Sequence, residues 1–263
     1  MSLVFAAITP HPPILIPTIG KNAIKKIDKT KKSMERLEED LYLSKPDILI
    51  IISPHGSYFK TSFTLNVCPE YETDLKEFGD LATRIKFKGE LHISSKIIEA
   101  TKTKGIPAVM ISEPKLDHGS SIPLYYLANH LKNLRLTQIG FCDLSWKSHI
   151  DFGYLLKDII MHTNKRVAVI ASGDLSHALT SDAPAGFNSA GAKFDEKIQE
   201  LLSHNNVAGM LQTDPELITN ASECGFRSFL ILMGMMKNVQ YDYKFYSYEC
   251  PFGVGYLTAN LIL

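Results

Sequence analysis

Short apolar runs alternate with longer amphipathic segments along most of the chain. Runs of this length, ended by polar or turn-forming residues, are typical of strands that are buried on both faces. We predict such strands at residues 3–9, 47–53, 108–112, 136–143 and 167–172. The sharpest ending follows the five apolar residues of 48–52, where the sequence continues as Ser-Pro-His-Gly.

The longer segments between these runs predict helices. Residues 21–43 are mostly polar, and their apolar positions recur near the helical period, at Ile24, Ile27, Met34, Leu37 and Leu41. Further helices are predicted at residues 94–103, 123–131, 152–162, 186–202 and 224–236. Residues 63–68 and 82–87 alternate between polar and apolar and predict a meander or an addition to a sheet edge; 241–248 and 253–263 predict closing strands.

The alternation of strands and helices predicts the α/β class, as a single three-layer α/β/α domain with a mainly parallel central sheet. We find no internal repeat and no low-complexity linker. The break richest in proline and glycine, at residues 181–187, falls between predicted elements and is expected to be a loop. We therefore expect residues 1–263 to form one domain.

The bulk composition excludes several classes of function. The 263 residues carry 28 basic and 28 acidic side chains, so no long-range field favours nucleic acid or an anionic membrane. The apolar runs are shorter than the ~20 residues of a membrane span, and no signal peptide is evident. The four cysteines, Cys68, Cys142, Cys224 and Cys250, lack metal-ribbon or redox spacing. We expect a reduced, cytoplasmic protein.

Three histidines directly follow predicted core strands. His11 follows 3–9, His55 follows 47–53 and His177 follows 167–172, each within a few residues of proline or glycine. A lone histidine in such a place is usually an ordinary hydrogen-bonded side chain. In open α/β sheets, however, ligand sites collect at the carboxyl ends of strands. We therefore expect these three imidazoles to meet in one cleft.

Further side chains with suitable chemistry lie nearby in sequence. His118 precedes a Gly-Ser stretch and a helix opened by Pro123, and it is either a loop residue or part of the site. Glu223 begins an apolar helix, and Asp174 precedes His177 by three residues. Two neutral histidines and one carboxylate form the facial ligand set of non-haem Fe(II) oxygenases. Similar donors also serve zinc hydrolases, so the donor chemistry alone leaves both open.

Six motifs occur in an order that resembles a known family. They are "TPHPP", "SPHGS", "DHGSSIPL", "SGDLSH", "SECG" and "PFGVGYL". Together they resemble the class III extradiol ring-cleavage dioxygenase superfamily, which includes the catalytic subunit of protocatechuate 4,5-dioxygenase. Within it, the pattern looks closest to the Memo family and the dioxygenase-like proteins associated with radical-SAM partners. The resemblance spans the chain from Thr9 to the last predicted strand.

The resemblance implies a ligand set and catalytic residues. The family's metal ligands match His11, His55 and Glu223, its acid–base histidine matches His177, and a further active-site histidine matches His118. The implied cofactor is Fe(II), with zinc as the other metal considered. Cys224 follows Glu223 as in Memo-type relatives, where cysteine replaces the glutamate, so Cys224 is a rival third ligand.

We therefore predict a non-haem Fe(II)-dependent extradiol dioxygenase that cleaves a catechol-like aromatic ring with O2. The expected partners are a small aromatic diol and O2, with no nucleic acid and no membrane. A homodimer and a protein partner both stay open. Two alternatives come from other classes: a non-catalytic, Memo-like protein that binds metal and a partner, and a zinc-dependent hydrolase that uses the same ligands.

Overall fold

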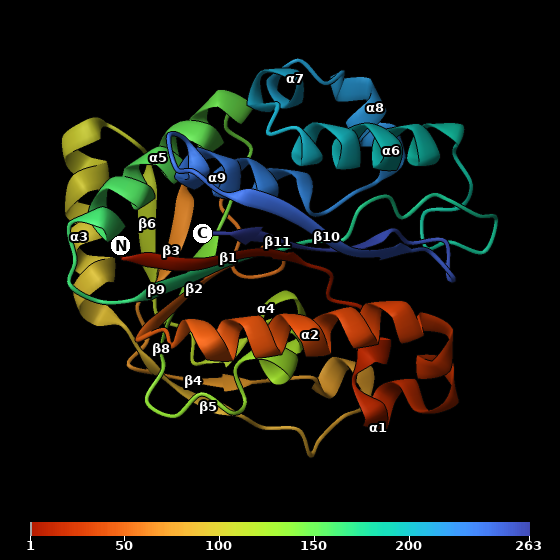
Figure 1. Ribbon diagram of the computed structural model, residues 1–263, viewed down its shortest axis with the longest axis horizontal. Helices are drawn as coiled ribbons and strands as arrows, with labels where there is room; N and C mark the ends of the chain where they lie inside the picture. The colour runs from red at the N-terminus through yellow and green to blue at the C-terminus, as the bar shows by residue number, and fades with distance from the viewer. Residues whose placement is uncertain (1) are drawn as a thin grey trace.

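A computed structural model describes residues 2–263 and shows an 11-stranded mixed sheet between two layers of helices (Figure 1). The strands are β1 (Leu3–Thr9), β2 (Ile48–Ser53), β3 (Phe63–Asn66), β4 (Glu70–Thr73), β5 (Lys86–Gly89), β6 (Ala108–Ile111), β7 (Lys115–Leu116), β8 (Arg135–Gly140), β9 (Val167–Ser172), β10 (Asp242–Glu249) and β11 (Tyr256–Ile262). Their order is β10-β11-β1-β9-β2-β8-β5-β4-β7, and β3 pairs with both β8 and β6. The predicted α/β fold with a mainly parallel sheet is confirmed.

Helices cover both faces of the sheet. The α-helices are α1 (Pro17–Gly20), α2 (Asp28–Ser44), α3 (Leu91–Lys104), α4 (His118–Leu127), α5 (Trp146–Met161), α6 (Ser189–Ser203), α7 (Val207–Leu211), α8 (Pro215–Ala221) and α9 (Phe226–Met236). Short 3-10 helices span Pro13–Leu15, Lys21–Ile27 and Lys76–Phe78. In Figure 1, α2 and α4 lie below the central strands, α5, α6 and α9 lie above them, and α3 lies at the left beside β6.

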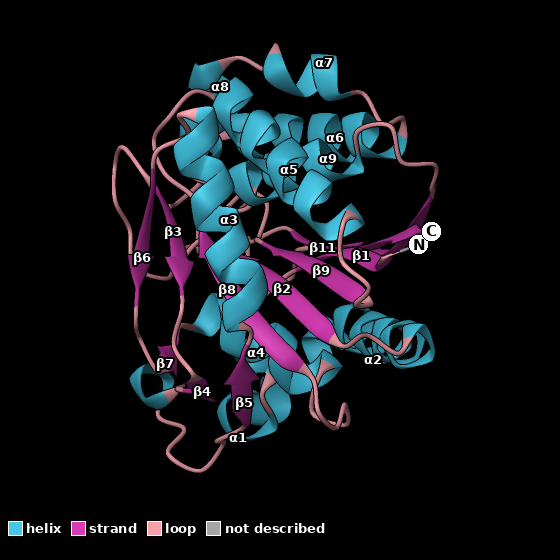
Figure 2. Cartoon of the chain, turned by 90° about the vertical axis from the view of Figure 1, so that its left-hand side faces the viewer, coloured by secondary structure: helices cyan, strands magenta, loops and turns pink. Residues whose placement is uncertain are grey.

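The four central strands determine where the site forms. β1, β9, β2 and β8 run parallel as neighbours, and Thr9 pairs with Ser172 while Ser53 pairs with Gly140. Figure 2 shows these strands side by side between the helical layers. β2 and β9 are buried along their whole length, which explains their continuous apolar sequences. Because parallel strands end at the same edge, the segments that follow β1, β2 and β9 leave the sheet side by side.

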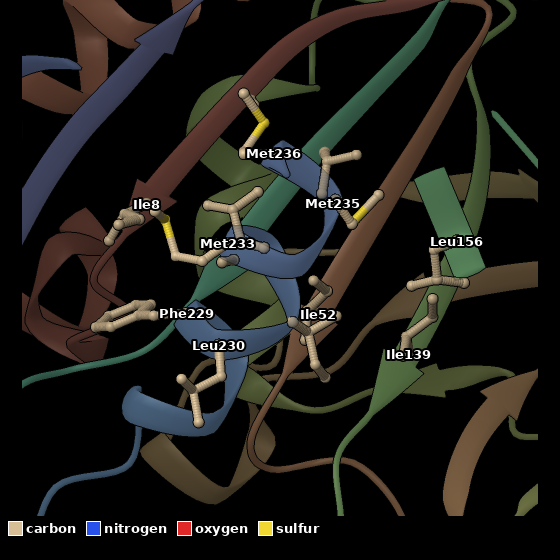
Figure 3. Packing of buried hydrophobic residues seen from close by; sticks show 14 of the residues in the cluster. Ile8, Ile52, Ile139, Leu156, Phe229, Leu230, Met233, Met235 and Met236 are labelled. Atoms are coloured by element: carbon tan, nitrogen blue, oxygen red, sulfur yellow. The ribbon is translucent and has the colours of Figure 1, made fainter. Parts of the chain in front are cut away.

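Helix α9 anchors the upper layer to this sheet. Phe229, Leu230 and Met233 pack near Ile8 and Ile52 of the central strands (Figure 3). Burying one such side chain contributes about 1.5–3 kcal/mol. A separate apolar cluster on the other face packs α2 and α4 against β1 and β2. The edge of the sheet is thus held rigidly between two helical layers.

Several boundaries differ from the sequence prediction. Residues 21–43 form a 3-10 helix, Lys21–Ile27, followed by α2, instead of one continuous α-helix. Helix α4 begins at His118, five residues before the predicted start, because the Asp117 side chain caps it by accepting from Ser120 N–H. The short elements β4, β7, α7 and α8 were not predicted. In the part of the chain described here, each helix is too short or too polar to cross a bilayer.

Candidate metal centre

His11 is the central residue of the site. It follows β1, is 2% exposed, and its backbone N–H donates to Oδ1 of Asp174 at 2.9 Å. Its Nδ1 lies 2.9 Å from Oγ of Ser172, whose hydroxyl proton is donated to the carbonyl of Gly119 at 2.6 Å. A hydroxyl has one proton to donate, so Nδ1 of His11 must carry the proton of this contact. Nε2 of His11 therefore presents a lone pair to the cleft, as a metal-binding histidine requires.

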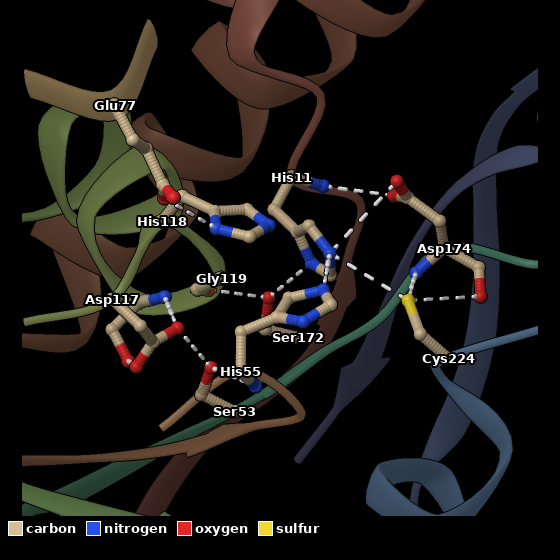
Figure 4. Close-up of polar contacts among 11 residues, drawn as sticks. His11, Ser53, His55, Glu77, Asp117, His118, Gly119, Ser172, Asp174 and Cys224 are labelled. Atoms are coloured by element: carbon tan, nitrogen blue, oxygen red, sulfur yellow. Dashed lines mark hydrogen bonds and ion pairs between the residues drawn. The ribbon is translucent and has the colours of Figure 1, made fainter. Parts of the chain in front are cut away.

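His55 faces this lone pair. Its Nε2 lies 3.0 Å from Nε2 of His11, and the two rings meet edge to face (Figure 4). Two nitrogen ligands at right angles, each about 2.1 Å from one ion, are about 3.0 Å apart, so this spacing fits neighbouring ligands of an octahedral ion. His55 follows β2, and its ring is partly open to solvent.

His118 completes a group of imidazoles. It stacks on His55 with ring centroids 4.1 Å apart, and its Nδ1 lies 3.1 Å from Oε1 of Glu77. Because a carboxylate only accepts, Nδ1 of His118 is the donor in this contact. Gly119 permits this packing, since a Cβ at that position would lie 2.6 Å from Oγ of Ser53.

Asp174 and Cys224 lie on the other side of His11 (Figure 4). Oδ2 of Asp174 is 3.9 Å and Sγ of Cys224 is 3.6 Å from Nε2 of His11. The backbones of Gly173 and Gly225 touch here, because a Cβ on Gly173 would lie 2.1 Å from Cα of Gly225. Two glycines thus allow the segment before α9 to carry Cys224 to the end of β9.

Two sets of donor atoms within residues 2–263 are close enough to share a metal ion. One is His11, His55 and His118; the other is His11, Asp174 and Cys224. In each set the donor atoms lie within 4.8 Å of one another. Imidazole, carboxylate and thiol groups thus surround the lone pair on Nε2 of His11. This combination of donor groups fits a transition metal ion.

Glu223 is placed outside both sets. One oxygen of its carboxylate accepts a hydrogen bond from the backbone N–H of Phe226, at the start of α9. The residue is half-buried, and the desolvation of its carboxyl raises the pKa of Glu223 to about 7, against the opposing effect of the Phe226 N–H and Arg227. The metal role predicted for Glu223 stays a prediction, and the carboxylate that accompanies His11 is Asp174.

His177 lies in the segment that follows β9, and a charge on its ring would help to lower the pKa of His11 and His55. Its backbone N–H donates to the carbonyl of Ala221 at 3.0 Å. Its Nδ1 is buried and has no hydrogen-bond partner within residues 2–263. Burial lowers the pKa of His177, which favours the neutral ring. The role of His177 as acid–base residue stays a prediction.

Burial and mutual repulsion lower the pKa of His11 and of His55 and favour their neutral rings. Burial, followed by the nearby His55, His118 and His177, holds the pKa of His11 well below its usual value. Burial, followed by His118 and His177, lowers the pKa of His55 to about 4. Such depressed values keep nitrogen lone pairs available to a cation at neutral pH.

The pKa values of the acidic groups beside His11 are raised, whereas those of His11 and His55 are lowered. Burial raises the pKa of Asp174 to about 7, although the N–H of His11 opposes this shift. Burial, followed by the charges of Asp174 and Glu223, raises the pKa of the Cys224 thiol well above its usual value. A cation in the site would compensate such buried negative charge, which is the usual reason for burying acids together.

Sequence reasoning missed the supporting residues. Asp117 is half-buried, caps α4, and also accepts from Ser53 Oγ at 2.5 Å and from Nε2 of Gln138. Burial raises the pKa of Asp117 even though the Ser53 hydroxyl opposes the shift. Glu77 lies in a 3-10 helix that is distant in sequence, and no sequence pattern marks it as a residue of the site. Ser172 could have been found, since it opens the "SGDLSH" motif.

A cavity of about 520 Å³ adjoins the imidazoles on the side away from Cys224, and His55, Glu77 and Asp117 are among its lining residues. A larger cavity of about 820 Å³ lies between α3 and α5. None of the potential metal-binding residues lines the larger cavity. The smaller cavity, which His55 lines, is therefore the better candidate for a substrate pocket.

Comparison with protein families gives a match over nearly the whole chain. The sequence model described as "Catalytic LigB subunit of aromatic ring-opening dioxygenase" matches residues 5–259. A protein of Clostridium acetobutylicum, CA_C1420, is 35% identical over 99% of this chain. The chain spans only 58% of the length of that relative.

More distant relatives are named after enzymatic activities. A 3,4-dihydroxyphenylacetate 2,3-dioxygenase of Escherichia coli is 25% identical over 73% of this chain and 70% of its own length. A 4,5-DOPA dioxygenase extradiol of Beta vulgaris is 23% identical over 67% of each chain. The crystal structure of an uncharacterized protein from Escherichia coli K12 has the same fold, with a TM-score of 0.69, 14% identity, and coverage of 98% of this chain and 99% of that one.

Proposed function

Since this chain belongs to the family of the catalytic LigB subunit of aromatic ring-opening dioxygenase, we propose that it cleaves a catechol-like ring with O2 at the centre around His11. The observation that carries the proposal is the pair of Nε2 atoms of His11 and His55, 3.0 Å apart at the carboxyl edge of the sheet. Names of the distant relatives, which cover 3,4-dihydroxyphenylacetate and DOPA, support an aromatic diol as substrate.

The proposed metal is Fe(II), bound by His11 and His55 and by Asp174, whose side chain is grouped with His11 and Cys224 in this structure and would turn toward His55 to complete the set. This is the two-histidine, one-carboxylate set that leaves adjacent positions open for substrate and dioxygen. Oδ1 of Asp174 is already held by the His11 N–H, whereas Oδ2 faces Nε2 of His11. Bound there, the metal would acidify the diol hydroxyls and allow electrons to pass from the ring to dioxygen.

Protein side chains would accept and return the protons of the reaction. A diol that binds as its anion must lose a proton; burial favours the neutral ring of His177, and its Nδ1 has no hydrogen-bond partner among residues 2–263. We assign His177 as the base that accepts this proton and later returns it to the developing product. His118, whose Nδ1 is held by Glu77, would hydrogen-bond a substrate hydroxyl through its other ring nitrogen. Ser172 fixes the His11 tautomer throughout.

One observation favours a second candidate, a zinc-dependent hydrolase. Sγ of Cys224 lies 3.6 Å from Nε2 of His11, close to the about 3.5 Å expected for sulfur and nitrogen ligands of tetrahedral zinc. A thiolate ligand favours zinc over a hard oxygen-binding iron site. The non-catalytic metal-binding alternative would use the same donors.

The test is anaerobic loading with Fe(II) or Zn(II), followed by addition of a catechol and oxygen. Oxygen uptake and a yellow ring-opened product with Fe(II), and neither with Zn(II), would support the proposal. Binding of iron without consumption of any catechol would reject ring opening. Retention of zinc through anaerobic purification, with hydrolysis of an ester or amide, would favour the hydrolase.

A further inference from the structure

Two buried amide side chains, Asn66 and Gln138, meet beside the cavity that His55 lines. They face each other on the antiparallel strands β3 and β8 and are 1% and 5% exposed. Nδ2 of Asn66 donates to Oε1 of Gln138 at 2.9 Å. A buried amide must satisfy both its donor and its acceptor groups, so each side chain continues into further hydrogen bonds. The two branches that leave this amide pair end at two segments that line the cavity.

One branch runs from Gln138 to the imidazoles. Nε2 of Gln138 donates to Oδ2 of Asp117, and Oδ1 of Asp117 accepts from Oγ of Ser53 at 2.5 Å (Figure 4). Oγ of Ser53 in turn accepts the backbone N–H of His55 at 3.3 Å. Asp117 also caps the helix that begins with His118. This branch therefore holds the backbones that carry both rings of the stacked pair.

The other branch runs from Asn66 to the segment that follows β6. Nδ2 of Asn66 also donates to the carbonyl of Glu113 at 2.8 Å, and Oδ1 accepts the Glu113 backbone N–H at 3.0 Å. One side chain thus holds both backbone groups of a residue that lines the cavity. On the exposed side, the Ser57 hydroxyl donates to the Glu113 carboxylate. The segments that follow β2 and β6 are therefore joined at two levels.

The carboxylate of Asp117 determines the direction of these hydrogen bonds. It accepts from Ser53 Oγ, from the backbone N–H and Oγ of Ser120, and from Gln138, which is the full capacity of a carboxylate. Gln138 must therefore turn its NH2 group toward Asp117 and its oxygen toward Asn66. Asn66 then presents its own NH2 group to Gln138. Reversing any of these contacts would place two donors or two acceptors face to face.

We propose that Asn66 and Gln138 are positioning residues for the reaction: they fix the segment that carries Glu113 relative to the imidazole pair and so set the width of the substrate cavity. The inference rests on the proposed function only for taking this cavity as the diol site. Neither amide belongs to the sets of potential metal donors. A displacement of about 1 Å in a reacting geometry can cost about 10²-fold in rate, so a rigid wall matters for a bound diol.

The experiment exchanges the carboxylate and the amide. Asp117→Asn places two amide donors face to face, and Gln138→Glu places two carboxylates face to face. The double variant restores a complementary contact with the two partners exchanged. Each single variant should weaken anaerobic binding of 4-methylcatechol to the Fe(II)-loaded protein about tenfold or more, and the double variant should recover to within about threefold, as measured by calorimetry. The affinity for Fe(II) should change by less than about threefold in all three variants.

A second readout requires neither metal nor substrate. The NMR resonances of the ring protons of His55 and His118 in the metal-free protein report the stacking of the two rings, whose centroids are 4.1 Å apart. These resonances should shift in each single variant and return in the double variant. Ser94→Ala is the matched control, because it removes a different buried hydrogen bond, from Oγ of Ser94 to the carbonyl of Glu90 at 2.7 Å. It should lower the unfolding temperature and change neither the resonances nor the affinity for catechol.

Unchanged imidazole resonances in both single variants would overturn the positioning role, and so would a double variant that stays as impaired as the single ones. An equal loss of Fe(II) and catechol affinity would also overturn it, by showing a general structural effect. Failure of the native protein to bind catechol would instead refute the proposed function. A shift of the resonances in the single variants and their return in the double variant would then still support the positioning role.

Discussion

Asp174 reaches His11 through both of its carboxylate oxygens: Oδ1 accepts the His11 backbone N–H at 2.9 Å, and Oδ2 lies 3.9 Å from Nε2 of the same residue. The acid therefore positions the backbone that carries His11 and also supplies a negative group beside its lone pair. Glu223, next to Cys224 in sequence, is instead turned toward the N–H of Phe226. This difference separates the roles of the two acids.

Asp174→Asn should weaken Fe(II) binding by more than about 100-fold, because even outer-shell partners of metal ligands contribute about 10–100-fold. Glu223→Gln should leave the affinity within a few-fold of the native protein, because its amide still accepts from Phe226. Calorimetry under anaerobic conditions measures both. The opposite ranking of the two variants would restore Glu223 as the carboxylate ligand.

Ser172→Ala should lower metal affinity about 10–100-fold, since the His11 Nδ1–H loses its acceptor and the tautomer is no longer fixed. The same change frees the carbonyl of Gly119, and the net loss of stability should be about 1–2 kcal/mol. Metal titration and urea unfolding report the two effects. Ser203→Ala, at the exposed end of α6, is the control. An unchanged metal affinity would show that the Ser172 contact does not select the tautomer.

His177→Gln should lower kcat for ring opening about 10²–10⁴-fold while iron is retained, because the variant loses the proton acceptor but none of the proposed ligands. Steady-state oxygen uptake and metal content are the measurements. His204→Gln, an exposed histidine that follows α6, should behave like the native protein. Loss of iron together with activity would instead make His177 a ligand.

Asp195 links the stability of the protein to pH. It is buried on α6, Oδ1 accepts from Ser176 N–H at 2.8 Å, and Oδ2 accepts from the Tyr248 hydroxyl at 2.6 Å. Burial raises its pKa from 3.8 to about 6, against these two hydrogen bonds. Because the pKa of Asp195 is higher in the folded than in the unfolded protein, its contribution to the free energy of unfolding is fully present below pH 3.8. This contribution is lost as the pH rises through about 6.

Asp195→Asn should therefore become more stable relative to the native protein as the pH rises from 4 to 7, by up to about 3 kcal/mol. The neutral amide can still accept from Ser176 and can donate to Tyr248. Urea unfolding of both proteins across this range isolates the residue, because Asp174 and Glu223 titrate in both. A stability difference that stays constant with pH would show that Asp195 is already protonated, or is solvated.

Much of the central sheet could be predicted from the sequence. β1 and β9 have the bounds that their apolar runs predict, 3–9 and 167–172, because buried parallel strands are continuously apolar and both runs end at a proline or glycine. The convergence of His11 and His55 also followed, since parallel strands end at one edge. These inferences need only periodicity and the topology of α/β sheets.

The remaining details depend on side-chain direction and on distant contacts. His118 begins α4 instead of lying in a loop, because Asp117 acts as the cap. Asp174 and Glu223 are both plausible ligands in sequence, and only the approach of Gly173 to Gly225 determines which one faces His11. Glu77 reaches His118 from a 3-10 helix 41 residues earlier, a contact for which no local pattern exists.

The most direct measurement is a crystal structure of the anaerobically iron-loaded protein, with anomalous data collected on both sides of the iron edge. We predict one iron peak about 2.0–2.3 Å from Nε2 of His11, Nε2 of His55 and a carboxylate oxygen of Asp174. An iron bound elsewhere, or a site in which either imidazole turns away from the ion, would contradict the proposed centre.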